Sequence, residues 1–124
     1  MTDLRSAPSE QFIQNDIRLA LGLDQDVVLW RNNVGLAERP TGGRVRYGLA
    51  VGSSDLIGIV VAVLGDHRVG RFLALEVKRP GQRPTKDQLA FLRLVQARGG
   101  VAAVVNSPTQ AVAVVEHAKR NPSY

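Results

Sequence analysis

The chain has 124 residues, which fits one domain over residues 1–124 with a single hydrophobic core. Hydrophobic residues make up 44% and aromatic residues only 5%, so we expect a core of Val, Leu, Ile and Ala, as in a compact α/β domain. The absence of cysteine excludes disulfides, thiol nucleophiles and cysteine-ligated zinc, and two histidines cannot hold zinc alone. A net charge of +5 favours a polyanionic partner such as nucleic acid, although scattered solubilising charge gives the same total.

No segment has the pattern of a membrane span or a signal sequence. The longest apolar runs, residues 59–64 and 101–105, are far shorter than a bilayer requires, and the polar start lacks a basic and then apolar region. We therefore expect a cytoplasmic protein.

The first third of the chain predicts a helix and a strand. Ser9 can cap a helix from Glu10 to about Leu21, and Gly22 supplies its stop. A strand is expected at residues 27–31, followed by an irregular, glycine-containing loop over 32–43 and a short extended piece at 44–48.

The remainder predicts a β-hairpin, a helix, a strand and a helix. Apolar segments at 55–64 and 71–78 flank a run of turn formers at 65–70. Thr85 opens a second helix that ends at Gly99-Gly100, and residues 101–105 form a buried strand. Ser107 caps and Pro108 starts a C-terminal helix over about 108–120. The expected fold is α/β, with a central mixed sheet of about four or five strands flanked by helices and a core over about 10–106.

Charged side chains converge on the predicted hairpin. Glu76 and Lys78 are two residues apart, so on a strand they project from one face while Val77 points to the other. If the hairpin folds between Gly65 and Asp66, Asp55 lies opposite Glu76, with Cβ atoms roughly 5 Å apart.

Two carboxylates this close repel each other unless a cation lies between them. An all-oxygen ligand set suits Mg²⁺ or Mn²⁺. Such an ion, bound to a phosphate, favours phosphodiester hydrolysis, in which Lys78 can orient water or offset developing charge. The alternative is a structural pair, in which Lys78 bridges an acidic residue on a solvent-facing sheet.

Two further polar residues fall on helix faces that point to the sheet. Glu10 precedes Ile13 and Ile17 on the apolar stripe of the first helix, which favours a role in the site; an acidic residue in the first turn also suits the helix dipole. Gln88 can reach a phosphate or the attacking water, but Thr85-x-x-Gln88 is also a capping box.

Taken together, these motifs resemble the VRR-NUC family, the virus-type replication-repair nucleases of the PD-(D/E)XK superfamily. The resemblance rests on Glu10, Gly-Ser-Ser-Asp-Leu-Ile-Gly at 52–58, Glu76-Val-Lys78, and Gln88 with Phe91, and it runs from about residue 10 to residue 105. One departure is Ser54, which stands where the superfamily name has proline. The resemblance implies a restriction-endonuclease-like fold with Asp55, Glu76, the Val77 carbonyl and Glu10 around the metal, Lys78 as catalytic lysine, and Gln88 completing the site.

Other residues are expected to bind rather than react. Basic side chains before and after the hairpin suit contacts with DNA phosphates, with scattered charge as the alternative; they are Arg39, Arg44, Arg46, Arg79, Arg83 and Lys86. Arg31, Asn32 and Asn33 can also line the site, although the asparagines suit a turn as well. We expect Trp30 and Tyr47 to belong to the core, with stacking on bases as the alternative.

The predicted function is a Mg²⁺- or Mn²⁺-dependent DNA endonuclease. The resemblance adds branched or junction DNA as substrate and a homodimer, for which apolar residues of the C-terminal helix, Val112, Val114 and Val115, are candidate contacts. The alternatives are a restriction-like nuclease on ordinary duplex, a DNA-binding module without turnover, and a structural protein whose hairpin charges are only ion pairs.

Overall fold

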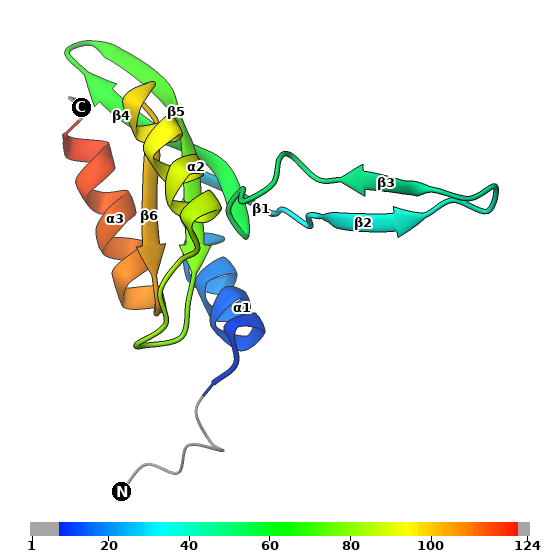
Figure 1. Cartoon of the computed structure of the whole chain (residues 1–124). Helices are drawn as coiled ribbons and strands as arrows, with labels where there is room; N and C mark the ends of the chain where they lie inside the picture. The colour runs from blue at the N-terminus through cyan, green and yellow to red at the C-terminus, as the bar shows by residue number, and fades with distance from the viewer. Residues whose placement is uncertain (1–7, 122–124) are drawn as a thin grey trace, which may run out of the picture.

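The computed structural model describes residues 8–121, and these form a mixed sheet covered by three helices. In chain order the elements are α1 (Glu10–Leu21), β1 (Val27–Arg31), β2 (Gly35–Glu38), β3 (Arg44–Tyr47), β4 (Leu56–Leu64), β5 (His67–Val77), α2 (Lys86–Ala97), β6 (Val101–Val105) and α3 (Pro108–Arg120). The main sheet has the order β1-β4-β5-β6, with β6 parallel to β5 and the other pairs antiparallel (Figure 1). The predicted α/β class and sheet are confirmed.

Side-chain caps fix the helix starts that the sequence predicts. Ser9 accepts from the Phe12 N–H at 3.1 Å, and Ser107 accepts from the Gln110 N–H at 3.2 Å. Thr85 and Gln88 form a complete capping box at the start of α2. These bonds satisfy N–H groups that a helix start otherwise leaves unpaired. No helix within residues 8–121 is long and apolar enough to cross a membrane.

The central hairpin has the predicted register but a shorter turn. Leu64 pairs with His67 and Leu56 pairs with Leu75, so the strands reverse at Gly65-Asp66. Gly65 has φ +60°, and glycine at the first position of a two-residue turn is typical of type II′ hairpins. The expected six-residue turn at 65–70 is therefore wrong, because two residues suffice and β5 already begins at His67.

The predicted irregular loop at 32–43 is also partly wrong. Residues 35–38 form β2, which pairs with β3 from Gly35↔Tyr47 to Glu38↔Arg44, and this two-stranded ribbon projects away from the main sheet (Figure 1). We call residues 35–47 the arm. The extended piece predicted at 44–48 corresponds to β3, whereas β2 was missed because its four residues bury no face and lack the apolar alternation of a packed strand.

Two apolar clusters hold the sheet between the helices. On one face, α1 and α3 cover Leu73, Leu75 and Val77 of β5. On the other, Leu92 and Val95 of α2 pack on Ala74 of β5 and Ala102 of β6. The end of β5 is thus buried on both sides. A charged residue there costs folding free energy unless a partner or a bound ligand compensates for its burial.

Part of the α2 face of the sheet has no cover among the described residues. Val28, Trp30, Ile59 and Phe72 are neighbours across β1, β4 and β5, and their exposed fractions are 41–51%. We call these four residues the open sheet face. The prediction that Trp30 and Tyr47 belong to the core is wrong, because α2 covers only the β5–β6 side and Tyr47 lies on the arm.

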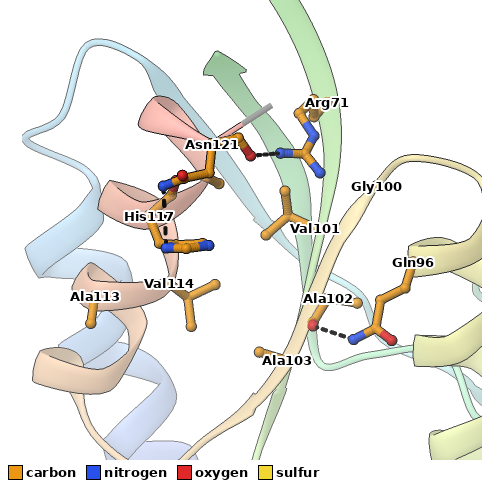
Figure 2. Close-up of a pocket in the computed structure, with 11 residues that line it drawn as sticks. Arg71, Gln96, Gly100, Val101, Ala102, Ala103, Ala113, Val114, His117 and Asn121 are labelled. Atoms are coloured by element: carbon orange, nitrogen blue, oxygen red, sulfur yellow. Dashed lines mark hydrogen bonds between the residues drawn. The ribbon is translucent and has the colours of Figure 1, made fainter. Parts of the chain in front are cut away.

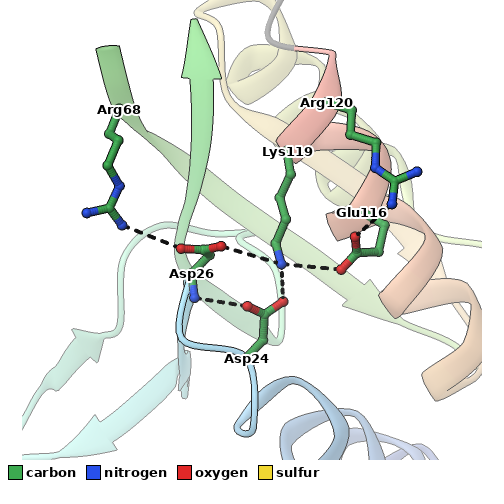
Figure 3. Close-up of polar contacts among 6 residues, drawn as sticks. All are labelled: Asp24, Asp26, Arg68, Glu116, Lys119 and Arg120. Atoms are coloured by element: carbon green, nitrogen blue, oxygen red, sulfur yellow. Dashed lines mark hydrogen bonds and ion pairs between the residues drawn. The ribbon is translucent and has the colours of Figure 1, made fainter. Parts of the chain in front are cut away.

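An ion cluster fastens the start of β1 to the C-terminal helix (Figure 3). Lys119 Nζ lies 2.5 Å from Asp24 Oδ2, 3.3 Å from Glu116 Oε1 and 3.7 Å from Asp26 Oδ2. Burial alone would raise the pKa of Asp24, but the hydrogen bonds from Lys119 and from the Asp26 N–H hold it below its usual range. The cluster is far in sequence from Asp55 and Glu76, and we assign it to stability.

Candidate active site

Glu76 is a carboxylate buried at the end of β5. Its exposed fraction is 1%, and neither side-chain oxygen has a hydrogen-bond partner among the described residues. Nearly all buried polar groups in proteins are hydrogen-bonded, so two carboxylate oxygens without a hydrogen bond favour a site where a ligand binds. The sheet position is the predicted one, with Val77 pointing into the opposite apolar cluster.

Asp55 is half-buried directly before β4, and backbone bonds fix its place. The main register puts it opposite Glu76, and its Oδ2 accepts from the Val77 N–H at 2.9 Å. The Asn32 N–H donates to the Asp55 carbonyl at 2.8 Å, and Asn32 Nδ2 donates to the Ser54 carbonyl at 2.9 Å. Asn32 therefore fixes the backbone at Ser54 and Asp55. Ser54 occupies the position of the proline in the PD-(D/E)XK motif.

Lys78 completes the predicted triplet. Its side chain is 14% exposed, and its Nζ lies 3.5 Å from Glu76 Oε1 and 3.8 Å from Glu10 Oε1. The Lys78 N–H continues the β5–β6 ladder by donating to the Val105 carbonyl. Both the strand end and the first turn of α1 thus hold the ammonium beside Glu76.

Within the group of Asp55, Glu76 and Lys78, the pKa of Glu76 departs from its ordinary value. Burial raises the pKa of Glu76, the neighbouring Asp55 charge raises it further, and Lys78 opposes both, with a result of about 8. A lysine at 3.5 Å therefore does not offset the cost of charging this carboxyl. Perturbed groups of this kind cluster at functional sites.

The residues present suit a divalent cation. A cation beside Asp55 would bind the Glu76 oxygens, which have no hydrogen bond, and relieve the repulsion between the carboxylates, with the Val77 carbonyl as a further oxygen donor. Among residues 8–121, no group of three or more His, Asp or Glu side chains comes together as a metal site. Glu10 lies against Lys78 instead, and its predicted role as a metal ligand stays a prediction.

Gln88 takes the capping role that the sequence left open. Its Oε1 accepts from the Thr85 N–H at 2.8 Å, while the Gln88 N–H donates to Thr85 Oγ1 at 3.2 Å. A catalytic role of Gln88 stays a prediction. Of the six basic residues expected to bind phosphate, Arg39, Arg44, Arg46, Arg83 and Lys86 are exposed and Arg79 is partly buried.

A polar cleft beside Asp55 contains residues that the sequence analysis missed. It is lined by Gln11 and Gln14 of α1, by residues 31–34, by Tyr47 and by Asp55. The Arg31 guanidinium lies 3.5 Å from both Gln11 Oε1 and Asn33 Oδ1. The available signal was helical spacing, because Gln14 follows Glu10 by four residues and so shares its face.

A second cavity, of about 600 Å³, lies away from this site between β6 and α3 (Figure 2). Its lining is mostly small and apolar, with Ala102, Ala103 and Val114 among the residues, and it holds no carboxylate. Figure 2 shows that Gln96 Nε2 bonds to the Ala102 carbonyl, at 2.9 Å, which blocks part of the exposed β6 edge. The carboxylate pair of Asp55 and Glu76 lies outside this cavity.

A known protein family matches most of the chain. The family model of the VRR-NUC domain matches residues 9–109, which include the whole site and most of the chain. The chain belongs to the VRR-NUC family. It is therefore a nuclease domain by family, and its α/β sheet is consistent with the PD-(D/E)XK-like fold. No curated protein matches the chain significantly.

Proposed function

We propose that this VRR-NUC domain is a divalent-metal-dependent DNA endonuclease. The observation that carries the proposal is the buried Glu76 carboxylate, unpaired by hydrogen bonds, opposite Asp55 and beside Lys78. Among the described residues, Glu76 has only the long contact of Oε1 with Lys78, at 3.5 Å, and no hydrogen bond to either oxygen, so both oxygens have capacity left for a ligand. This argues against the alternative in which the hairpin charges serve only as ion pairs.

Asp55, Glu76 and the Val77 carbonyl would hold Mg²⁺ or Mn²⁺. The bound ion supplies Lewis-acid polarisation of the scissile phosphate and lowers the pKa of the attacking water. Lys78 is held between Glu76 and Glu10, so its ammonium can orient that water and stabilise charge that develops on the phosphate oxygens. Glu10 acts through Lys78 and is a positioning residue.

DNA binding falls to the exposed basic residues on both sides of the site. Arg83 and Lys86 follow β5, and Arg39, Arg44 and Arg46 lie on the arm, so phosphates to either side of the cut can be held. We propose branched or junction DNA as the preferred substrate, on the strength of the family resemblance. The alternatives are cleavage of ordinary duplex and binding without turnover.

A homodimer suits junction cleavage because it places two identical sites in fixed relation. Of the three expected contacts on α3, Val115 is fully buried and Val114 packs against the core, so among them Val112, which is 38% exposed, is the one left for a partner. The helix is apolar on more than one side because α1, β4 and β6 all contact it. We instead assign the interface to the open sheet face, whose four apolar side chains are adjacent and exposed.

The dimer is tested by sedimentation of two charge variants. Phe72→Glu places a charge on the open sheet face and should convert a dimer of about twice 13.4 kDa into a monomer. Leu19→Glu is the matched control, because Leu19 is exposed on α1 away from that face. Equal behaviour of both variants would exclude the open sheet face as the interface.

The proposed activity is tested with a substrate panel. A four-way junction, a flap, a single strand and a plain duplex are incubated with the wild type in Mg²⁺, in Mn²⁺ and in chelator. We expect cleavage only with metal, fastest on the junction. Equal rates on all duplex-containing substrates would favour the restriction-like alternative, and binding without cleavage would favour the silent module.

A further inference from the structure

The arm has two chemically different faces. Because directly paired residues share a face, Leu36, Glu38, Arg44 and Arg46 lie on one side, and Ala37, Val45 and Tyr47 lie on the other. Every residue from 36 to 50 is exposed. We call the first side the basic face of the arm, because it carries Arg44 and Arg46 against Glu38. Arg39 lies at the tip, so the whole arm carries three arginines and one glutamate.

Such a ribbon has little stability of its own. A two-stranded hairpin that packs on nothing is marginal in water, and side chains without contacts add no burial energy. This arm is nevertheless fixed at its root. Gly48 adopts φ +95°, and a Cβ there would approach the Asn33 carbonyl to 2.5 Å, so the returning strand packs directly on the outgoing one.

The root of the arm is also hydrogen-bonded to the segment before β4, which carries Asp55. Asn32, three residues before the arm, bonds to Ser53, Ser54 and Asp55 through its backbone and side chain. Tyr47, the last residue of the arm, lines the polar cleft that contains Asp55. The direction in which the arm leaves the sheet is therefore fixed relative to the carboxylate that would hold the metal.

We propose that the arm is a groove-binding β-ribbon, which lays its basic face into double-stranded DNA flanking the scissile phosphate. This inference rests on the proposed function. Four residues at about 3.4 Å each, with the turn, give a reach of roughly 20 Å. The major groove of B-DNA is about 12 Å wide and about 8.5 Å deep, and it admits a two-stranded ribbon.

Charge selects DNA over a second copy of the chain. The arm carries a net charge of +2, from Arg39, Arg44 and Arg46 against Glu38, and the whole chain carries +5. A second positive copy would be repelled by the basic face, whereas a duplex is a dense array of phosphates. The apolar face, with only Ala37, Val45 and Tyr47, is too small to carry a stable dimer alone.

The consequence is a requirement for duplex on one side of the cut. An enzyme with this arm should bind more tightly as the uninterrupted flank grows to about one helical turn, roughly 10 bp, and gain little beyond it. Single-stranded flanks lack a groove, so they should not give this gain.

The experiment measures DNA affinity without cleavage. The 124-residue chain carrying Glu76→Gln is titrated in chelator against duplexes of graded flank length, and Kd is measured by fluorescence anisotropy at several salt concentrations. Arg44→Ala with Arg46→Ala should weaken binding to the long duplex roughly 10- to 100-fold at 0.1 M salt and reduce the log–log salt slope by about 2. The dependence on flank length should disappear in this double variant.

Two controls separate the basic face from general effects. Val45→Ala changes the opposite face of the same strand, and Arg18→Ala with Arg93→Ala removes two exposed arginines from helices. Both should keep the flank dependence. Circular dichroism and thermal melts establish that each variant is folded.

The outcomes are distinguishable from those for the proposed function. Unchanged affinity and slope in the Arg44/Arg46 variant would overturn the arm proposal, even if the wild type cuts DNA with metal. A wild type that cuts nothing, but whose affinity depends on the basic face and on flank length, would retain the arm and refute the nuclease. A change of oligomeric state in Val45→Ala would show that the arm contacts a second copy, and would overturn the proposal.

Discussion

Replacing Glu76 by glutamine should stabilise the metal-free protein at alkaline pH. The side chain is 1% exposed, and burial together with the Asp55 charge raises its pKa from an ordinary value of 4.5 to about 8. Between these values the unfolded chain is deprotonated at this position while the folded chain is protonated, so stability falls as pH rises. At about 1.4 kcal/mol per pH unit, the loss approaches about 5 kcal/mol as an upper value.

The measurement is urea denaturation in chelator at about pH 5 and about pH 8. The wild type should lose stability between these pH values, and Glu76→Gln should lose less, because a neutral amide has no proton to release. Glu38→Gln is the control, since Glu38 is an exposed glutamate on the arm and should follow the wild type. Adding Mn²⁺ should stabilise the wild type far more than Glu76→Gln.

The difference in stability between the two variants is the decisive quantity, because titrating groups away from Asp55, Glu76 and Lys78 contribute equally to both. Parallel pH profiles for the wild type and Glu76→Gln would refute the reasoning: they would mean that the carboxyl is charged without cost, and so already paired inside the fold. A stabilisation by Mn²⁺ that survives in Glu76→Gln would place the ion elsewhere.

Three further changes test other parts of the structure. Lys78→Met should reduce the single-turnover cleavage rate at least 100-fold with little change in DNA affinity. Arg83→Ala should weaken DNA affinity and leave the cleavage rate at saturating DNA unchanged. The reverse pattern would make Lys78 a phosphate contact. Lys119→Met should lower the free energy of unfolding by about 1–2 kcal/mol, measured in urea near neutral pH. Since the pKa of Asp24 is below its ordinary 3.8, this difference from wild type should be present above that pH and shrink as pH falls further, and a constant difference would argue against the ion pair. Gly65→Val should cost about 1–2 kcal/mol in the same assay, because a β-branched residue is strained at φ +60°, and no loss would mean that the turn can change type.

The sequence predicted the parts of the fold that local chemistry determines. Capping residues gave the starts of α1, α2 and α3, and the turn pair Gly65-Asp66 gave the hairpin register that brings Asp55 opposite Glu76. Registers are predictable where one residue of slip would expose the core face. The pairing of the two candidate catalytic carboxylates follows from that constraint.

The sequence did not predict which faces of the strands and helices are exposed, because that depends on where the other elements pack. Trp30 looked like a core residue, but whether a sheet face is buried depends on where α2 lies, and α2 covers β5 and β6 only. The apolar sides of α3 suggested an interface, yet Val114 and Val115 face the core of the same chain and Val112 is the exposed one of the three. The first strand of the arm, β2, was missed because an exposed strand carries no burial pattern.

The central claim is that Asp55 and Glu76 together bind the metal with which the domain cuts DNA, and one measurement tests it most directly. Single-turnover cleavage of a labelled four-way junction is followed at saturating Mn²⁺ for the wild type and for Asp55→Asn, with DNA affinity measured in parallel. We predict that the wild type cuts, that chelator stops it, and that Asp55→Asn binds the junction with unchanged or tighter affinity but loses at least 1,000-fold in rate, because the substitution removes one ligand charge and keeps the side-chain shape. Cleavage by Asp55→Asn at the wild-type rate would contradict the account.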